Sequence, residues 1–353
     1  MTERYVGVQL LRYVAAMLVA LMHITQAISM HITGRGSDQY WEPGGAGVDI
    51  FFVISGFVMA TATASVPRPG QTRVAAAWLF LKRRLLRIAP LYWFYTLLKA
   101  ALLLALPTLA VQSSLDGGHL LASLLFLPAR GPSGLLQPTL QVGWTLNFEM
   151  FFYVVFALAI GLGAPRARFC VLVFLAFFLA SALFPAIDPL RFYAQTRVFE
   201  FVAGMLVALW VSRLRAVPPA LSCALFTAGM VWLLLVDWAP GSDELLRSGL
   251  AATAIVLCTV ALEPWFTRSR LAARLSFLGD ASYSIYLSHA LVVPAAVLSM
   301  RRLGVTDPVV IVLFTASVVT LVGCLSYTLL ERPMTSIFKR VLFSPRREAV
   351  RNA

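Results

Sequence analysis

Long apolar stretches constrain this chain more than any other feature of its sequence. Ten of them, each about 17 to 25 residues long, can cross a hydrocarbon core of roughly 30 Å as a helix. A spanning segment must satisfy its own backbone N–H and C=O groups, which favours helices. We therefore predict an all-α membrane protein with about ten transmembrane helices, near residues 8–30, 45–64, 88–107, 139–162, 169–186, 197–212, 219–236, 247–263, 281–300 and 308–330.

The composition excludes the main soluble alternatives. Apolar residues make up 59% of the chain and charged residues 13%, against about 45 to 50% and 25% in ordinary soluble domains. A disordered chain needs the opposite balance, and four cysteines are too few for a disulfide scaffold. The cysteines lie in apolar stretches without a C-x-x-C pair, so we predict structural thiols and no metal site.

The surplus of basic residues has a membrane explanation. Lys and Arg number 29 against 16 Asp and Glu, a net charge of +13, which in a soluble chain would suggest nucleic acid. With ten crossings and both termini in the cytoplasm, 21 of the 29 basic residues fall on the cytoplasmic side and seven on the other. This is the positive-inside pattern. We therefore predict a cytoplasmic N-terminus, a cytoplasmic C-terminus and no nucleic-acid partner.

The chain shows no internal repeat and no separate soluble segment. Its basic start resembles a signal peptide, but the apolar run that follows is as long as a full span, and no A-x-A cleavage site occurs before Gly34. The segment 119–128 is too short to cross and is typical of an interfacial piece. We predict a transmembrane domain over residues 1–337 and a basic cytoplasmic tail over 338–353.

Ionisable residues inside the membrane are the best guide to function, because each costs about 2.5 to 3.5 kcal/mol there. Arg12 and His23 share one face of the first helix and lie roughly 16 Å apart along its axis. Asp49 begins the second helix at a similar depth to His23, where a carboxylate would orient the imidazole. We predict His23 as a general base. A snorkelling interfacial side chain is the alternative for Arg12.

Small residues of the second helix fit packing better than chemistry. Gly44, Gly45, Gly47 and Gly56 allow close approach of a neighbouring helix. We interpret Ser55 as a packing residue as well.

Arg84 and Arg87 stand just before the third apolar stretch, three residues apart and so on one helical face. The positive-inside bias explains their charge by itself. A pair of guanidinium groups at the edge of a span also suits the phosphates of an anionic cytoplasmic ligand. No P-loop motif occurs in the chain, so side chains would have to hold a nucleotide.

The fourth apolar stretch carries a polar stripe. Thr145, Glu149 and Tyr153 follow one another at intervals of four residues on an otherwise aromatic helix, directly after Trp144. Glu149 lies near the middle of the membrane, where an unpaired carboxylate is costly.

The ninth and tenth stretches add further polar groups. Ser282, Tyr286 and His289 share one face, and we expect Asp280 to cap the start of that helix. Glu331 lies at the cytoplasmic end of the tenth stretch, where an ion pair with Arg332 at a helix stopped by proline is the simple interpretation.

Six motifs in this order resemble the acyltransferase-3 family of integral membrane acyltransferases. They are R-x10-H in the first helix, GGAGVDIFFVISGF, RRLLRIAP, GWTLNFEMFFY, LGDASYSIYLSH and a terminal ERP. The resemblance runs from about Tyr5 to Met334 and is greatest to bacterial exopolysaccharide O-acetyltransferases of the succinoglycan type.

The resemblance implies an acyl-CoA-dependent enzyme of the bacterial inner (plasma) membrane. Such an enzyme takes an acetyl group from cytoplasmic acetyl-CoA, its co-substrate, and places it on a hydroxyl of a lipid-linked or growing saccharide. Membrane lipids surround it, and no metal takes part. Some relatives append a soluble hydrolase-like domain, which this sequence does not contain.

The resemblance also carries residues over. Arg84 and Arg87 match the family's R-x-x-R motif for the CoA phosphates, and Arg12, His23 and Glu331 match its first-helix arginine, catalytic histidine and final-helix glutamate. Where many relatives have serine after the tryptophan, this chain has a threonine, which keeps the hydroxyl. Our site prediction has three parts, namely catalytic His23, Asp49 and Glu149, donor-binding Arg12, Arg84, Arg87 and Glu331, and a substrate path of Trp144, Tyr153, Tyr286 and His289.

Two other classes remain open from the sequence. A proton-coupled transporter would also bury histidine and glutamate, although it would more often show internal repeats and broken helix pairs. A non-enzymatic subunit for polysaccharide export or assembly would not need the arginine pair. Consumption of acetyl-CoA by the purified protein distinguishes the three.

Overall fold

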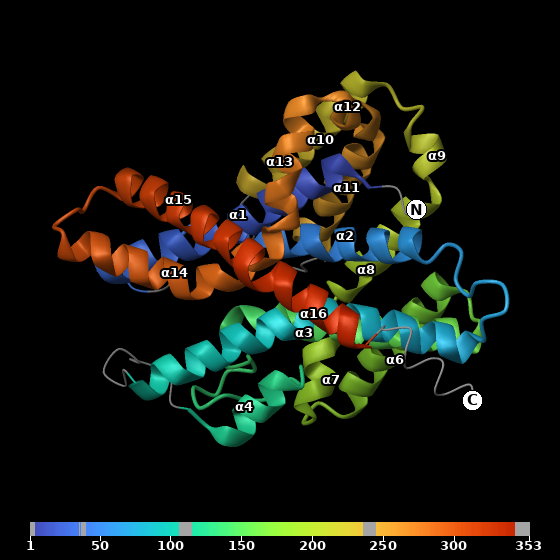
Figure 1. Ribbon diagram of the computed structural model, residues 1–353, viewed down its shortest axis with the longest axis horizontal. Helices are drawn as coiled ribbons and strands as arrows, with labels where there is room; N and C mark the ends of the chain where they lie inside the picture. Colours follow the sequence, from blue (N-terminus) through green and yellow to red (C-terminus); the bar gives the residue numbers. More distant parts are fainter. Residues whose placement is uncertain (1–3, 35, 37–39, 106–114, 236–244, 343–353) are drawn as a thin grey trace.

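The computed structural model describes residues 4–34, 36, 40–105, 115–235 and 245–342. Within these ranges the chain is helical and contains no β-strand (Figure 1). Short π or 3-10 turns cover Ser29–Thr33, Glu42–Ala46, Gln141–Gly143, Leu245–Gly249 and Tyr327–Glu331. The helices are α1 (Val6–Ile28), α2 (Gly47–Ala62), α3 (Arg73–Ala105), α4 (Gly117–Leu124), α5 (Trp144–Leu162), α6 (Arg166–Leu183), α7 (Asp188–Tyr193), α8 (Val198–Leu209), α9 (Val211–Leu214), α10 (Pro219–Leu235), α11 (Leu250–Ala261), α12 (Glu263–Arg268), α13 (Arg270–Asp280), α14 (Ser282–Arg302), α15 (Pro308–Ser326) and α16 (Arg332–Leu342).

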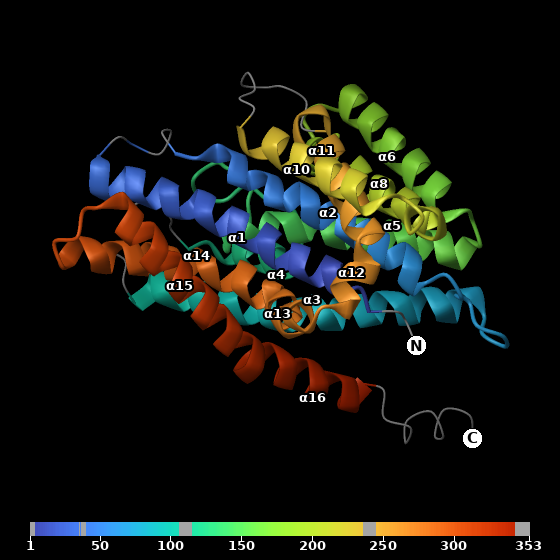
Figure 2. The ribbon, with the colours of Figure 1, turned by 90° about the horizontal axis from the view of Figure 1, so that it is seen from above.

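The all-α membrane fold is confirmed. Within the described ranges, eight helical segments are long and apolar enough to cross a membrane, and the segments around α10 and α11 are shorter apolar helices. Together they correspond to the ten predicted stretches. The start of α1 and the end of α16 lie toward the same end of the long axis (Figures 1 and 2). That placement agrees with termini on one side; which side is cytoplasmic stays a prediction.

Two predicted helix boundaries are wrong, because averaged hydropathy does not detect a helix that continues through a charged, amphipathic segment. Helix α3 begins at Arg73 rather than near residue 88, since Ala76 and Phe80 of its charged first half are buried in the core. Proline does not stop the last helix either. After the turn Tyr327–Glu331, α16 continues to Leu342 with Pro333 at its second position, where the missing N–H costs nothing.

Helix α16 therefore crosses the boundary that we predicted between the transmembrane domain and the tail. Residues 343–353 of that tail lie outside the described residues, as do positions 35 and 37–39 of the loop after α1. Helix α4 has only eight residues, in keeping with the interfacial piece predicted near residues 119–128. All four cysteines are free thiols.

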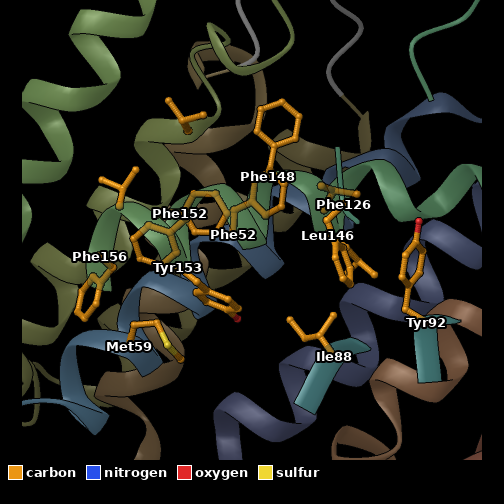
Figure 3. Packing of buried hydrophobic residues seen from close by; sticks show 14 of the residues in the cluster. Phe52, Met59, Ile88, Tyr92, Phe126, Leu146, Phe148, Phe152, Tyr153 and Phe156 are labelled. Atoms are coloured by element: carbon orange, nitrogen blue, oxygen red, sulfur yellow. The ribbon is translucent and has the colours of Figure 1, made fainter. Parts of the chain in front are cut away.

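Helix α5 forms the main core through its aromatic face. Phe148, Phe152 and Phe156 follow one another along the helix, one turn apart, and Phe52 of α2 packs among them (Figure 3). The ring of Phe201 on α8 completes the stack, with its centroid 4.5 Å from that of Phe52 and 4.4 Å from that of Phe152. This aromatic row lies one residue out of step with the polar stripe of α5, so the rings and the polar groups lie on adjacent faces of the helix.

Close helix packing accounts for the glycines of α2, as predicted. A Cβ on Gly56 would collide with the carbonyl oxygen of Phe201, and a Cβ on Gly204 with that of Val53, so α2 and α8 approach at backbone distance. A Cβ on Gly47 would likewise meet a carbonyl oxygen of α1. Small residues permit this approach, which fixes the second helix tightly beside the first.

Helix α1 is the structural axis on which the site is built. It packs against α2, α11, α13, α14 and α15. The Glu263 carboxylate accepts hydrogen bonds from the backbone N–H groups of Val6 and Gly7, which satisfies the exposed amides at the helix start. Arg4 pairs with Asp280 at 2.7 Å. Our prediction that Asp280 caps α14 is therefore wrong, because this residue ends α13 and α14 has no side-chain cap.

Candidate active site

Glu149 of α5 is the centre of a hydrogen-bonded group drawn from two helices. Ser55 of α2 donates to the Oε1 atom of Glu149 at 2.5 Å, and Tyr153 donates to the same oxygen at 2.9 Å. The hydroxyl oxygens of Ser55 and Tyr153 lie 3.4 Å apart. The prediction that Glu149 and Tyr153 share one face of the helix is confirmed. Our interpretation of Ser55 as a packing residue alone is wrong, since its hydroxyl donates a hydrogen bond to the Glu149 carboxylate.

Arg84 approaches the same group from α3. Its guanidinium carbon lies 5.6 Å from the centroid of the Phe80 ring, and its charge is within electrostatic reach of Tyr153 and Glu149. Its Nε atom is buried without a hydrogen-bond partner among the described residues. A buried guanidinium N–H that lacks an acceptor favours an anionic ligand beside it.

Arg12 and Glu331 extend this group across the bundle. Arg12 lies within electrostatic reach of Arg87, Glu331 and Glu149. Glu331 is 7% exposed, accepts a hydrogen bond from the Ser284 hydroxyl at 2.6 Å, and interacts electrostatically with Arg87. Pairing with Ser284 on α14 replaces the simple helix-end ion pair that we considered for this glutamate.

Five charged side chains, contributed by four segments of the chain, thus form one unit that we call the arginine cluster. Its three guanidinium groups exceed its two carboxylates by one positive charge. In a low-dielectric setting such an excess attracts an anion strongly. The members of the arginine cluster are Arg12, Arg84, Arg87, Glu149 and Glu331.

The two histidines meet further along α1 and α14. The ring of His23 stacks on that of His289, with centroids 5.2 Å apart and an angle of 29° between the planes. The Nδ1 atom of His23 is 3.2 Å from Oε1 of Gln26, so Gln26 accepts a hydrogen bond when Nδ1 carries the proton, which leaves Nε2 unprotonated in the neutral ring. His289 is fully buried, and its ring nitrogens hydrogen-bond to no other helix in the described ranges.

Tyr286 links the histidines to the start of α5. Its ring centroid lies 5.5 Å from that of His289. Its hydroxyl donates to the carbonyl oxygen of Val142 at 2.9 Å and lies 2.9 Å from the hydroxyl of Thr145. The predicted sharing of one face by Tyr286 and His289 is confirmed.

A cavity of ≈ 330 Å³ opens beside these groups, and we call it the histidine cavity. His23, Asp49, Trp144 and Tyr286 are among its lining residues. Asp49 is 4% exposed and faces the same space as His23. The hydrogen bond of the His23 ring, however, goes to Gln26 on its own helix. The role of Asp49 in orienting the ring stays a prediction.

The polar stripe of α5 joins the two regions. Thr145 bonds to Tyr286 beside the histidine cavity, and Glu149, one turn further on, belongs to the arginine cluster. On α1, Arg12 and His23 lie eleven residues apart, roughly 16 Å. The predicted site residues therefore lie in two groups, a cationic one and a histidine one, and the stripe of α5 places polar side chains between them. We call this arrangement the polar path.

Three contributors to this path were missed from the sequence. Gln26 could have been found, because it follows His23 by three residues and so lies on the same helical face. Ser55 and Ser284 could not, since their partners Glu149 and Glu331 are 94 and 47 residues away in the chain. Only the packing of helices brings those hydroxyls to the carboxylates.

Comparison with known proteins gives a consistent result. The acyltransferase-3 family model, described as an acyltransferase domain, matches residues 5–329. The chain is 36% identical over 298 residues to the exopolysaccharide production protein ExoZ of Rhizobium meliloti (strain 1021), which covers 82% of this chain and 89% of that protein. It is 28% identical over 324 residues to the acyltransferase MdmB of Streptomyces mycarofaciens, which covers 80% and 77% of the two chains. No solved structure matches the chain significantly.

Proposed function

Because the chain belongs to the acyltransferase-3 family, we propose that this membrane acyltransferase moves an acetyl group from cytoplasmic acetyl-CoA to a hydroxyl of a cell-surface saccharide or exopolysaccharide. The location that we propose is the bacterial inner membrane. The family supports acyl transfer, and a relative named for exopolysaccharide production supports the class of acceptor.

The observation that carries the proposal is the polar path itself. A donor held on one side of a membrane and an acceptor on the other require an anion-binding end, a base at depth and a polar connection between them. The arginine cluster, His23 and the stripe of α5 match these requirements in order. A non-enzymatic export subunit gives no reason for this arrangement.

In the proposed reaction the arginine cluster binds the phosphates of CoA. Arg12, Arg84 and Arg87 would supply charge-assisted hydrogen bonds, while Glu331 and Glu149 hold the guanidinium groups in place by electrostatic attraction. An extended pantetheine arm is long enough to reach across about half of the hydrocarbon core, so the thioester would arrive near His23 while the nucleotide stays at the arginines.

The chemical step would take place in the histidine cavity. Nε2 of His23 accepts the proton of the acceptor hydroxyl, and the hydroxyl oxygen forms a bond to the thioester carbonyl carbon. The carbon–sulfur bond then breaks, and CoA leaves as a thiolate that recovers the proton from the imidazolium. Positioned general-base catalysis of this kind contributes about 10² to 10⁴ in rate.

A sided transfer assay tests the proposal. Purified protein is reconstituted in sealed, oriented vesicles with radiolabelled acetyl-CoA only inside and a membrane-impermeant saccharide only outside. We expect acetylated saccharide outside. Acetylation that occurs only when both substrates share one side would contradict the transmembrane route, and no acetyl-CoA consumption under any arrangement would contradict the activity itself.

A further inference from the structure

A second cavity, of ≈ 470 Å³, adjoins the histidine cavity. The two cavities share Gln137, Trp144 and Arg197 in their linings. The two cavities therefore lie side by side, separated by these shared side chains. We call the second cavity the arginine–tryptophan cavity, since Arg130 and Arg191 line it as well.

The lining of the arginine–tryptophan cavity is strongly positive. It contains three arginines and a single acidic residue, Asp188. Arg130 binds Asp188 through two hydrogen bonds, from Nε at 2.5 Å and from Nη2 at 2.6 Å. This bidentate pair occupies both carboxylate oxygens of Asp188. Arg191, one turn further along α7, is exposed and lies within electrostatic reach of Asp188. With one carboxylate among three guanidinium groups, the lining keeps an excess of positive charge.

The same cavity also has the features of a saccharide site. The guanidinium carbon of Arg197 lies 4.9 Å from the centroid of the Trp144 ring, so a cation–π pair fixes this aromatic side chain in the lining that both cavities share. Gln137 and Gln195 add amide groups that both donate and accept hydrogen bonds. Aromatic surfaces combined with a few placed polar groups are typical of small-molecule sites.

We propose that the arginine–tryptophan cavity is an acceptor subsite that binds an anionic group carried by the saccharide. This inference rests on the proposed function, because it assigns the neighbouring histidine cavity to the hydroxyl that is acetylated. The anion is a carboxylate of an acidic sugar or a phosphate that links the saccharide to its lipid. Arg191 binds it, and Trp144 supports the sugar ring between the two cavities. The subsite thereby selects acidic acceptors and sets which hydroxyl reaches His23.

Equilibrium binding without acetyl-CoA tests the subsite independently of catalysis. Detergent-purified protein is dialysed against three labelled oligosaccharides of equal length, one neutral, one with a carboxylate and one with a terminal phosphate. We expect at least one anionic form to bind about tenfold more tightly than the neutral form, the usual effect of a charge-assisted hydrogen bond. The form with the advantage identifies the source of the anion. Equal binding of all three would overturn the proposal.

Three variants locate the effect. Arg191→Gln should remove most of the preference for the anion, and Arg191→Lys should restore part of it because the charge returns. Arg302→Gln is the matched control, since Arg302 is an exposed arginine at the end of α14 outside this lining, and it should keep the full preference. An undiminished preference in Arg191→Gln would contradict the assignment. Failure of the proposed function looks different, because wild-type protein would then keep the binding preference but acetylate none of the three saccharides.

Discussion

The arginine cluster and the histidine cavity share helices α1 and α5 but are built in opposite ways. In the cluster, every side chain lies within reach of an opposite charge, and Ser55 and Ser284 bind the two carboxylates. Around the cavity, the two imidazoles stack on each other and ≈ 330 Å³ stays open. Charged side chains also line it, but His23 hydrogen-bonds to the neutral amide of Gln26 rather than to one of them. One region holds charges in place, while the other leaves room for a reactant.

This difference follows from the cost of charge in a low dielectric. A buried guanidinium or carboxylate is tolerated when partners surround it, and losing one partner is expensive. A proton acceptor, by contrast, must be neutral before the reaction and must touch its substrate, which requires space rather than partners. We therefore expect removal of a side chain to have different effects in the two regions, on the rate of transfer at the histidine cavity and on donor binding at the arginine cluster.

The largest effect should come from His23→Ala in the histidine cavity. We expect acetyl transfer to fall by about 10² to 10⁴, the contribution of a general base, while CoA binding measured by equilibrium dialysis stays unchanged. His289→Ala should lose less, because His289 stacks behind His23 and is not one of the described residues that line the cavity. Full activity of His23→Ala at matched expression would remove the basis for the mechanism.

Arg84→Ala and Arg87→Ala come next and should show the opposite pattern. Each removes a charge-assisted contact worth about 1.5 to 3 kcal/mol, so the KM for acetyl-CoA should rise by roughly tenfold to a hundredfold, with a smaller change for the acceptor. With acetyl-pantetheine, which lacks the nucleotide phosphates, the loss should be muted. Arg83→Ala is the control, since it removes the same charge from the same part of α3 but Arg83 is not a member of the arginine cluster. Equal losses with both donors would mean that these arginines only set the orientation of the protein in the membrane and do not bind the phosphates.

Local periodicity predicted those parts of the site that lie along a single helix. The stripe of Thr145, Glu149 and Tyr153 and the shared face of Tyr286 and His289 depend only on the pitch of one helix, so the sequence contains them. Hydropathy located the spans because they are also local features. Each transmembrane helix satisfies its backbone hydrogen bonds within its own segment.

Periodicity cannot predict which side chains of another helix contact a given residue. Ser55 and Ser284 reach their carboxylates only after α2 packs on α5 and α14 packs on the turn before α16. The charged first half of α3 was missed for a related reason, because its burial depends on contacts with the core rather than on its own composition.

Ser55→Ala tests the arginine cluster with a smaller expected effect. The variant removes the 2.5 Å hydrogen bond to Glu149, and a bond to a charged group is worth about 1.5 to 3 kcal/mol. We expect a lower thermal unfolding midpoint and a KM for acetyl-CoA raised by several-fold, because Glu149 loses one of the two hydroxyl partners that hold it near Arg84. Thr259→Val is the control, since it removes a buried hydroxyl that donates to the carbonyl oxygen of Ile255 on its own helix at 2.8 Å, away from the cluster. If both variants lose equal stability, the hydroxyl of Ser55 has no special role at the cluster.

The smallest effect should come from Gln26→Ala, which tests how much internal bonding the histidine cavity needs. The Gln26 amide oxygen is a neutral partner of His23, and such a bond is worth about 0.5 to 1.5 kcal/mol. Its loss frees the ring to carry its proton on either nitrogen and to turn within the stack, so kcat should fall by about two- to tenfold while the KM for acetyl-CoA stays constant. Gln26→Glu keeps an acceptor oxygen at the same position and should retain more activity than Gln26→Ala. The informative measurement is whether kcat or the KM for acetyl-CoA changes, because disruption of the arginine cluster mainly raises the KM for the donor. A raised donor KM in Gln26→Ala, with kcat intact, would show that the two regions are not separable and that His23 contributes to donor binding.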